Sequence, residues 1–145
     1  MDGMDVVINA VVVIMEHFSK VKKVGEGAFA SVYKAKDLRT GETVALKTMY
    51  SQETGNGLPP EALREASILR SLRHKNIVGL KEAIYGHEVV HLVLEWVATD
   101  LYCKIYKNLP LPTIRSFMAQ LLTGLADRKS TRLNSSHLVI SYAVF

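Results

Sequence analysis

The sequence predicts an α+β fold, in which a small antiparallel sheet is followed by helical segments. Three observations support this prediction. Short runs of β-branched and aromatic residues alternate with glycine-containing turns up to residue 96. A double proline at positions 59 and 60 marks the start of a helical segment. Large apolar residues at helical spacing occupy residues 114–125.

The first three predicted strands surround two turns. Residues 18–35 are β-branched, aromatic and small on either side of Gly25 and Gly27, which predicts a strand, a glycine turn and a second strand. Residues 43–47 form a third apolar run, directly after the turn signal of residues 39–41. This part of the chain therefore predicts three consecutive antiparallel strands.

A helix is expected next. Residues 51–57 are polar and contain two glycines, so they are predicted to form a loop. Pro60 suits the first helical position, and the acidic Glu61 suits the first turn. The helix is expected to end near Leu72.

Two more strands complete the predicted sheet, at residues 77–85 and 88–96, with the connection at residues 85–87. A connector with two prolines follows. After it, one apolar stripe predicts a second helix; its members are Ile114, Phe117, Met118, Leu121, Leu122 and Leu125.

Composition narrows the class of protein. A length of 145 residues with 48% hydrophobic and 22% charged residues suits one globular domain. The net charge of +4 is spread along the chain, so we expect no nucleic-acid partner. A single cysteine, Cys103, excludes an internal disulfide and a cysteine-based zinc site, which fits a reducing compartment.

The apolar run at residues 6–14 raises the question of a signal peptide. Asp2 and Asp5 stand where a signal peptide carries basic residues, and the run is too short to span a bilayer. We therefore expect no membrane attachment and an intracellular protein, located in the nucleus, the cytoplasm or both.

The glycine pattern suggests a phosphate site, because a turn without side chains lets backbone N–H groups approach phosphate oxygens. Gly25, Gly27 and Ala30 also satisfy the loose dinucleotide-binding fingerprint. That fingerprint requires a helix after the glycines and an acidic residue about 20 positions later. Here a strand-like segment follows, and Lys47 stands near that distance. No glycine-lysine-serine/threonine sequence closes the motif as a P-loop.

Lys47 ends an apolar strand, where an unpaired ammonium group is costly. We therefore expect an anionic partner, and Glu65 on the following helix is the candidate. No residues are assigned as metal ligands.

From residue 15 to residue 126 the chain resembles the cyclin-dependent protein kinases. The resemblance rests on the start at residues 15–21, the glycine turn, Lys47, and three later segments. Residues 58–65 resemble the cyclin-binding P-S-T-A-I-R-E helix, residues 74–78 resemble H-P-N-I-V, and residues 93–97 fall where the hinge should be. It implies a kinase-like N-lobe, with a five-stranded antiparallel sheet and an αC helix, followed by the first helices of a truncated C-lobe. Residues 15–98 would form the N-lobe and hinge, and residues 99–126 would begin the C-lobe.

The resemblance also implies the site and its ligands. In this family the lysine at Lys47 contacts the α- and β-phosphates of ATP, and the helix glutamate at Glu65 holds it in place. Leu94 would be the gatekeeper, and Asp100 would face the ribose. The full set of implied nucleotide-binding residues is Val24, Gly25, Glu26, Gly27, Val32, Ala45, Lys47, Leu94, Glu95, Val97 and Asp100. The implied partners are ATP with Mg²⁺, a cyclin-like protein bound through the helix around Leu63, and a protein substrate.

The family pattern stops after residue 126. The H-R-D, D-F-G and A-P-E motifs, which would carry the magnesium ligands and the catalytic aspartate, do not occur. Residues 127–145 instead resemble a translated sequencing adapter, and we interpret them as a non-native tail. Residues 1–14 precede the family-like start and are of doubtful origin, either translated leader sequence or a genuine extension.

The leading hypothesis is therefore an ATP-dependent serine/threonine kinase of the cyclin-dependent type, present as a fragment that is predicted to be inactive. The alternative is a catalytically inactive module that binds a cyclin or a nucleotide. A nucleotide-binding dehydrogenase is a third hypothesis, and it predicts binding of a nicotinamide cofactor instead of ATP.

Overall fold

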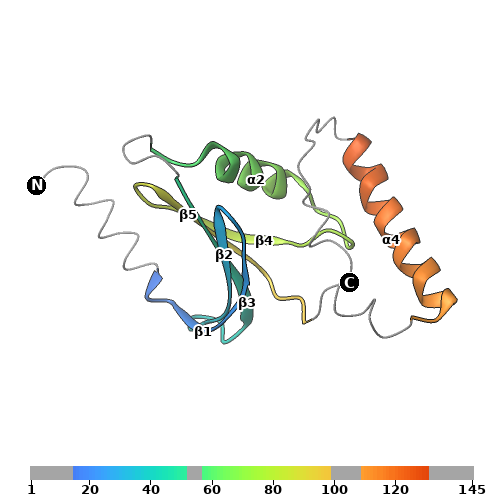
Figure 1. Cartoon of the computed structure of the whole chain (residues 1–145), viewed down its shortest axis with the longest axis horizontal. Coiled ribbons are helices and arrows are strands. Elements are labelled where there is room, and N and C mark those ends of the chain that lie inside the picture. The colour runs from blue at the N-terminus through green and yellow to red at the C-terminus, as the bar shows by residue number, and fades with distance from the viewer. Residues whose placement is uncertain (1–14, 52–56, 99–108, 131–145) are drawn as a thin grey trace, which may run out of the picture. The chain divides into compact units, whose positions relative to one another are not determined.

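Five strands and two helices make up the described part of the chain. The computed structural model describes residues 15–51, 57–98 and 109–130. The elements are β1 (Phe18–Glu26), β2 (Ala30–Asp37), β3 (Thr43–Tyr50), α2 (Pro60–Ser71), β4 (Leu80–Tyr85), β5 (Val89–Glu95) and α4 (Leu111–Ser130) (Figure 1). All strand pairs are antiparallel, in the order β1-β2-β3-β5-β4. The predicted α+β fold with a five-stranded antiparallel sheet is confirmed.

The chain divides into two compact units. The first unit consists of the residues up to Ser67 together with Leu80–Trp96, and it contains the whole sheet. The second unit consists of Ile68–Gly79 and the residues from Val97 onward, and it contains α4. Within the described residues, no helix is both long and apolar enough to cross a membrane.

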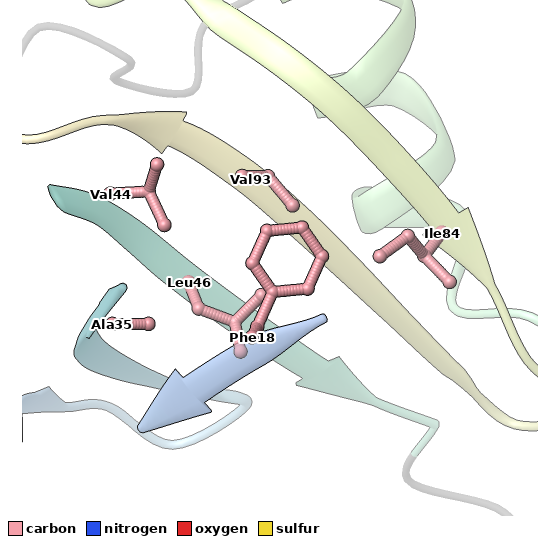
Figure 2. Close-up of a cluster of buried hydrophobic side chains, with 6 residues drawn as sticks. All are labelled: Phe18, Ala35, Val44, Leu46, Ile84 and Val93. Atoms are coloured by element: carbon pink, nitrogen blue, oxygen red, sulfur yellow. The ribbon is translucent and has the colours of Figure 1, made fainter. Parts of the chain in front are cut away.

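Strand alternation gives the sheet two chemically different faces. The register places Leu46 of β3 opposite Tyr33 of β2 and Val93 of β5, so these side chains share one face. We call it the Leu46 face. Its buried apolar side chains are Phe18, Ala35, Val44, Leu46, Ile84 and Val93 (Figure 2). We call the opposite face, which carries Val32, Ala45 and Lys47, the Lys47 face.

Two strand boundaries differ from the prediction. β3 was expected to end at Lys47 but continues to Tyr50, because its last residues pair with the start of β5 and the Tyr50 N–H donates to the Phe29 carbonyl at 3.3 Å. β4 was expected from Ile77 but begins at Leu80. The Ile77 N–H donates to the His74 carbonyl in a turn, so its burial comes from a loop and not from a strand.

The second predicted helix is present and extends to Ser130, beyond the stripe from which it was predicted. The residues of that stripe differ in burial. Phe117, Leu121 and Leu125 are half-buried, whereas the other side is exposed; the exposed large apolar residues of α4 are Leu111, Ile114, Met118 and Leu122. Asn76 donates to the Gln120 side chain at 2.9 Å, which ties the 72–79 segment to α4 within the second unit.

The turn between β2 and β3 is held by a charged network around Arg39. Gly41 has a φ of 75°, a conformation that favours glycine, and its N–H donates to the Asp37 carbonyl at 2.7 Å. The Arg39 guanidinium pairs with the buried Asp37 carboxylate at 2.9 Å and with Glu82 of β4 at 2.8 Å. It also lies over the Phe18 ring, 5.0 Å from the centroid. Arg39 thereby connects the turn to β1 and β4.

We expect Arg39→Ala to lower the free energy of unfolding by about 1–2 kcal/mol, because it removes charge-assisted hydrogen bonds to a buried carboxylate. The hydrogen bonds from Arg39 hold the pKa of Asp37 below its ordinary 3.8. That contribution is present above the ordinary pKa and is lost as the pH falls through the folded-state value. Urea titrations at pH 7 and below pH 3 should therefore show the difference from the parent shrinking in acid.

The matched control is Lys81→Ala, which removes an exposed ion pair with Glu42 on the same part of the sheet. Exposed pairs of this kind contribute about 0–1 kcal/mol. Equal losses in the two variants would show that Arg39 acts as an ordinary surface charge.

Candidate functional site

The most distinctive contact between the sheet and α2 is the ion pair between Lys47 and Glu65. The Lys47 ammonium lies 2.8 Å from Glu65 Oε1 and 2.7 Å from Oε2, so one cation contacts both carboxylate oxygens. The two side chains are 11% and 17% exposed. The pair predicted from the cost of burying an unpaired lysine is therefore formed, in surroundings where most of the water is excluded.

Local sequence explains how both residues reach this position. Along β3, Val44 and Leu46 point to the Leu46 face, so Lys47 must point to the opposite one. The helix α2 begins at Pro60, and the Pro59 carbonyl accepts hydrogen bonds from the N–H groups of Ala62 and Leu63. Glu65 follows in the second turn of α2.

Two neighbouring rows of cross-strand partners make up the Lys47 face. In the first row Gly25 is opposite Val32, Val32 is opposite Lys47, and Lys47 is opposite Leu92. A β-carbon built on Gly25 would lie 3.7 Å from the Val32 Cβ, so this glycine leaves the approach to Val32 open. The row places a glycine, an apolar side chain and the paired lysine side by side.

The second row runs from Lys34 to Ala45 to Leu94, one alternation further along the same strands. Ala45 and Lys34 are half-buried and Leu94 is buried. Together the two rows bring five of the predicted site residues onto one face of the sheet, and Glu65 reaches them from α2; the five are Gly25, Val32, Ala45, Lys47 and Leu94.

The glycine turn is formed without a positive φ at either of its glycines. Within the described residues the glycines with positive φ are Gly41 and Gly57, so neither Gly25 nor Gly27 adopts such a conformation. The Gly27 N–H donates to the Ala30 carbonyl at 2.8 Å. A β-carbon on Gly27 would meet only that carbonyl oxygen, at 3.9 Å. These glycines therefore provide open space beside the turn.

Other predicted site residues lie apart from these rows. Val24 is 46% exposed. Glu26 is paired at 2.6 Å with Lys23 on the surface, and this contact raises the pKa of Lys23. The exposed Glu95 is opposite Val44, so its side chain belongs to the Leu46 face. Val97 is half-buried and follows the sheet, and Asp100 lies outside the described residues.

The sequence prediction missed Lys34. Its ammonium lies over the ring of Trp96, 5.2 Å from the centroid. The available signal was its position two residues after Val32 in a strand, which places both on the same face. Sequence alone did not connect it with Trp96.

The arrangement suits an anionic, partly apolar ligand. A lysine held by a carboxylate has a fixed direction, as recognition of phosphate oxygens requires. The neighbouring Val32, Ala45 and Leu94 offer an apolar surface for a flat group. In the part of the chain that the structure describes, no group of three or more histidine, cysteine, aspartate or glutamate residues could hold a metal ion.

Comparison with known protein families agrees with this geometry. The family model described as the protein kinase domain matches residues 18–129. The match includes the whole sheet, α2 and nearly all of α4.

Proposed function

Because the chain belongs to the protein kinase domain family, we propose that it is part of a serine/threonine kinase of the cyclin-dependent type, which transfers the γ-phosphoryl group of ATP to protein hydroxyls. Kinase and transferase activity follow from the family. The cyclin-dependent type and the serine/threonine specificity rest on the sequence motifs described above.

The observation that carries the proposal is the Lys47–Glu65 pair. In protein kinases this lysine binds the α- and β-phosphates, and the pair must be formed for activity. Here the ammonium contacts both carboxylate oxygens within 2.8 Å and lies beside the glycine turn, which fits a bound triphosphate. When bound, ATP supplies the phosphoryl group to be transferred. Lys47 would hold the phosphates, and Glu65 would fix the direction of Lys47.

The remaining site residues support an adenine nucleotide in particular. Val32 and Ala45 share the Lys47 face, where they would contact the base. Leu94 lies on the same face and would border the base as the gatekeeper. We propose that the backbone of Glu95 and Val97 bonds the adenine, as the family resemblance implies. Mg²⁺ would accompany ATP, with ligands outside the residues assigned here.

The partner expected for this type of kinase is a cyclin-like protein. Leu63 on α2 is 41% exposed, although it is a large apolar residue, and Arg64 beside it is also exposed. An apolar residue presented next to a charged one suits the edge of a protein interface. We propose that this part of α2 binds the cyclin.

The test measures three activities of the same chain. Calorimetry with Mg·ATP and, separately, NAD⁺ distinguishes a kinase from a dehydrogenase. Transfer of γ-labelled phosphate to a mixed protein substrate, followed by phosphoamino acid analysis, tests the predicted inactivity of the fragment and identifies the residue type of any label. Pull-down with a panel of cyclins uses Leu63→Glu as the variant and Arg70→Glu, which is exposed about two turns further along α2, as the control.

Mg·ATP binding, cyclin capture that Leu63→Glu alone abolishes, and no transfer of labelled phosphate are the expected results, because the H-R-D and D-F-G motifs do not occur in this chain. Cyclin capture without Mg·ATP binding would favour the noncatalytic module, and labelled phosphoserine or phosphothreonine would contradict the predicted inactivity of this fragment. Binding of NAD⁺ in preference to ATP would overturn the kinase assignment for this site.

A further inference from the structure

Lys34 makes a contact that the backbone hydrogen bonds of the sheet do not provide. It belongs to β2, whereas Trp96 directly follows the last residue of β5. These two strands are not neighbours, because β3 lies between them. The Lys34 ammonium nevertheless lies 5.2 Å from the centroid of the Trp96 ring, so its side chain reaches across β3.

The residue that it crosses explains why this is possible. Lys34 is opposite Ala45, and Ala45 is opposite Leu94, two residues before Trp96. A single methyl group at position 45 leaves room for the four-carbon lysine stem along the sheet. A lysine commonly lays its stem on an apolar surface while its charged end finds a favourable partner, and here an aromatic ring is that partner.

The contact lies where a nucleotide base would bind. Ala45 is the cross-strand partner of Lys34, and Val32 lies two residues before it in β2. Both of these residues would contact the base. β2 also follows the glycine turn directly. A link from β2 to the end of β5 would therefore limit how far the turn and its strand can move away from the base.

We propose that Lys34 is a positioning residue for the nucleotide, which bridges to Trp96 and thereby holds the glycine turn close to the bound base and slows release of the nucleotide. This role rests on the proposed function, because it requires a nucleotide on the Lys47 face. The neighbouring Lys36 is exposed on the same strand and carries the same charge, so a general electrostatic effect can be separated from this contact.

The experiment uses the full chain and three variants. Lys34→Met keeps a long apolar side chain but removes the charge, Lys34→Arg keeps a cation able to lie over the ring, and Lys36→Met is the control for charge. Trp96 is the single tryptophan of the chain, so its emission without nucleotide reports the contact directly. Stopped-flow release of a fluorescent ATP analogue reports the role, and urea midpoints show that each variant is folded.

We expect Lys34→Met to change the Trp96 emission and to speed nucleotide release by about two- to fivefold, the range of a cation–π contact at a partly exposed site. Lys34→Arg and Lys36→Met should match the parent chain. If Lys34→Met and Lys36→Met release the analogue at the same rate, the positioning role is wrong although the chain binds nucleotide. If the parent binds no ATP analogue, the proposed function fails and the positioning role fails with it, whereas the emission still tests the contact.

Discussion

Lys47→Met is expected to weaken Mg·ATP binding by about ten- to a hundredfold. The estimate follows from the loss of hydrogen bonds between a charged donor and phosphate oxygens, which contribute about 1.5–3 kcal/mol in such sites. Glu65→Gln should have a smaller effect of about fivefold, because the amide still accepts one hydrogen bond from Lys47 but no longer carries the opposite charge. Equilibrium titration with a fluorescent ATP analogue measures both.

The combination of the two changes is the sharper test. If Glu65 acts only by orienting Lys47, it has nothing to orient in Lys47→Met, so the double variant should bind ATP no more weakly than Lys47→Met alone. Lys36→Met, with the same change of charge on an exposed residue, should bind like the parent. Additive losses in the double variant would show that Glu65 contacts the ligand independently of Lys47.

The Lys47–Glu65 pair shows which part of the site the sequence could predict. Alternation along β3 forces Lys47 away from the Leu46 face, and burial of an ammonium group demands an acidic partner, so both rules operate on local sequence. The glycine turn and the Pro59-Pro60 helix start were predicted for similar local reasons. The family resemblance then assigned roles to Lys47 and Glu65, which local physics had already singled out, whereas Leu94, Glu95, Val97 and Asp100 came from the resemblance alone.

Features that depend on distant pairing were not predicted. The end of β3 is set by β5, about 40 residues later, and the burial of Ile77 comes from a turn instead of a strand. The contact of Lys34 with Trp96 requires that β3 separates β2 from β5 and that residue 45 is small. Strand order of this kind is a tertiary property, which the pattern of a single segment does not contain.

The surroundings of His91 also depend on distant strand pairing, and they lead to a prediction about the stability of the fold in acid. His91 belongs to β5, is 8% exposed, and its Nδ1 lies 3.0 Å from the hydroxyl of Thr48, its cross-strand partner in β3. Ile84 of β4 is its partner on the other side, and the Lys20 ammonium of β1 is the charged group that acts on it. Burial, with a further effect of Lys20, lowers the pKa of His91 from 6.5 to about 4.

Between pH 6.5 and about pH 4, His91 is therefore protonated in the unfolded chain but mostly neutral in the folded chain. The stability that results is fully present above pH 6.5 and is lost progressively as the pH falls through this window, with a total of about 3 kcal/mol. Urea titrations at pH 7 and pH 4.5 should show this loss in the parent chain.

Aspartate and glutamate side chains also titrate in acid. Comparison with His91→Asn is therefore needed to isolate the part of the stability loss that comes from His91. Asparagine keeps a polar atom near Thr48 but binds no proton, so the loss between pH 7 and pH 4.5 should be smaller in this variant by most of the 3 kcal/mol estimated above. His87→Asn, at an exposed position before β5, is the matched control for replacing a histidine by asparagine. Thr48, the cross-strand partner of His91, directly follows Lys47, the lysine that we propose binds phosphate. If the parent and His91→Asn lose stability in parallel, His91 titrates normally in the folded chain and its burial does not restrict protonation.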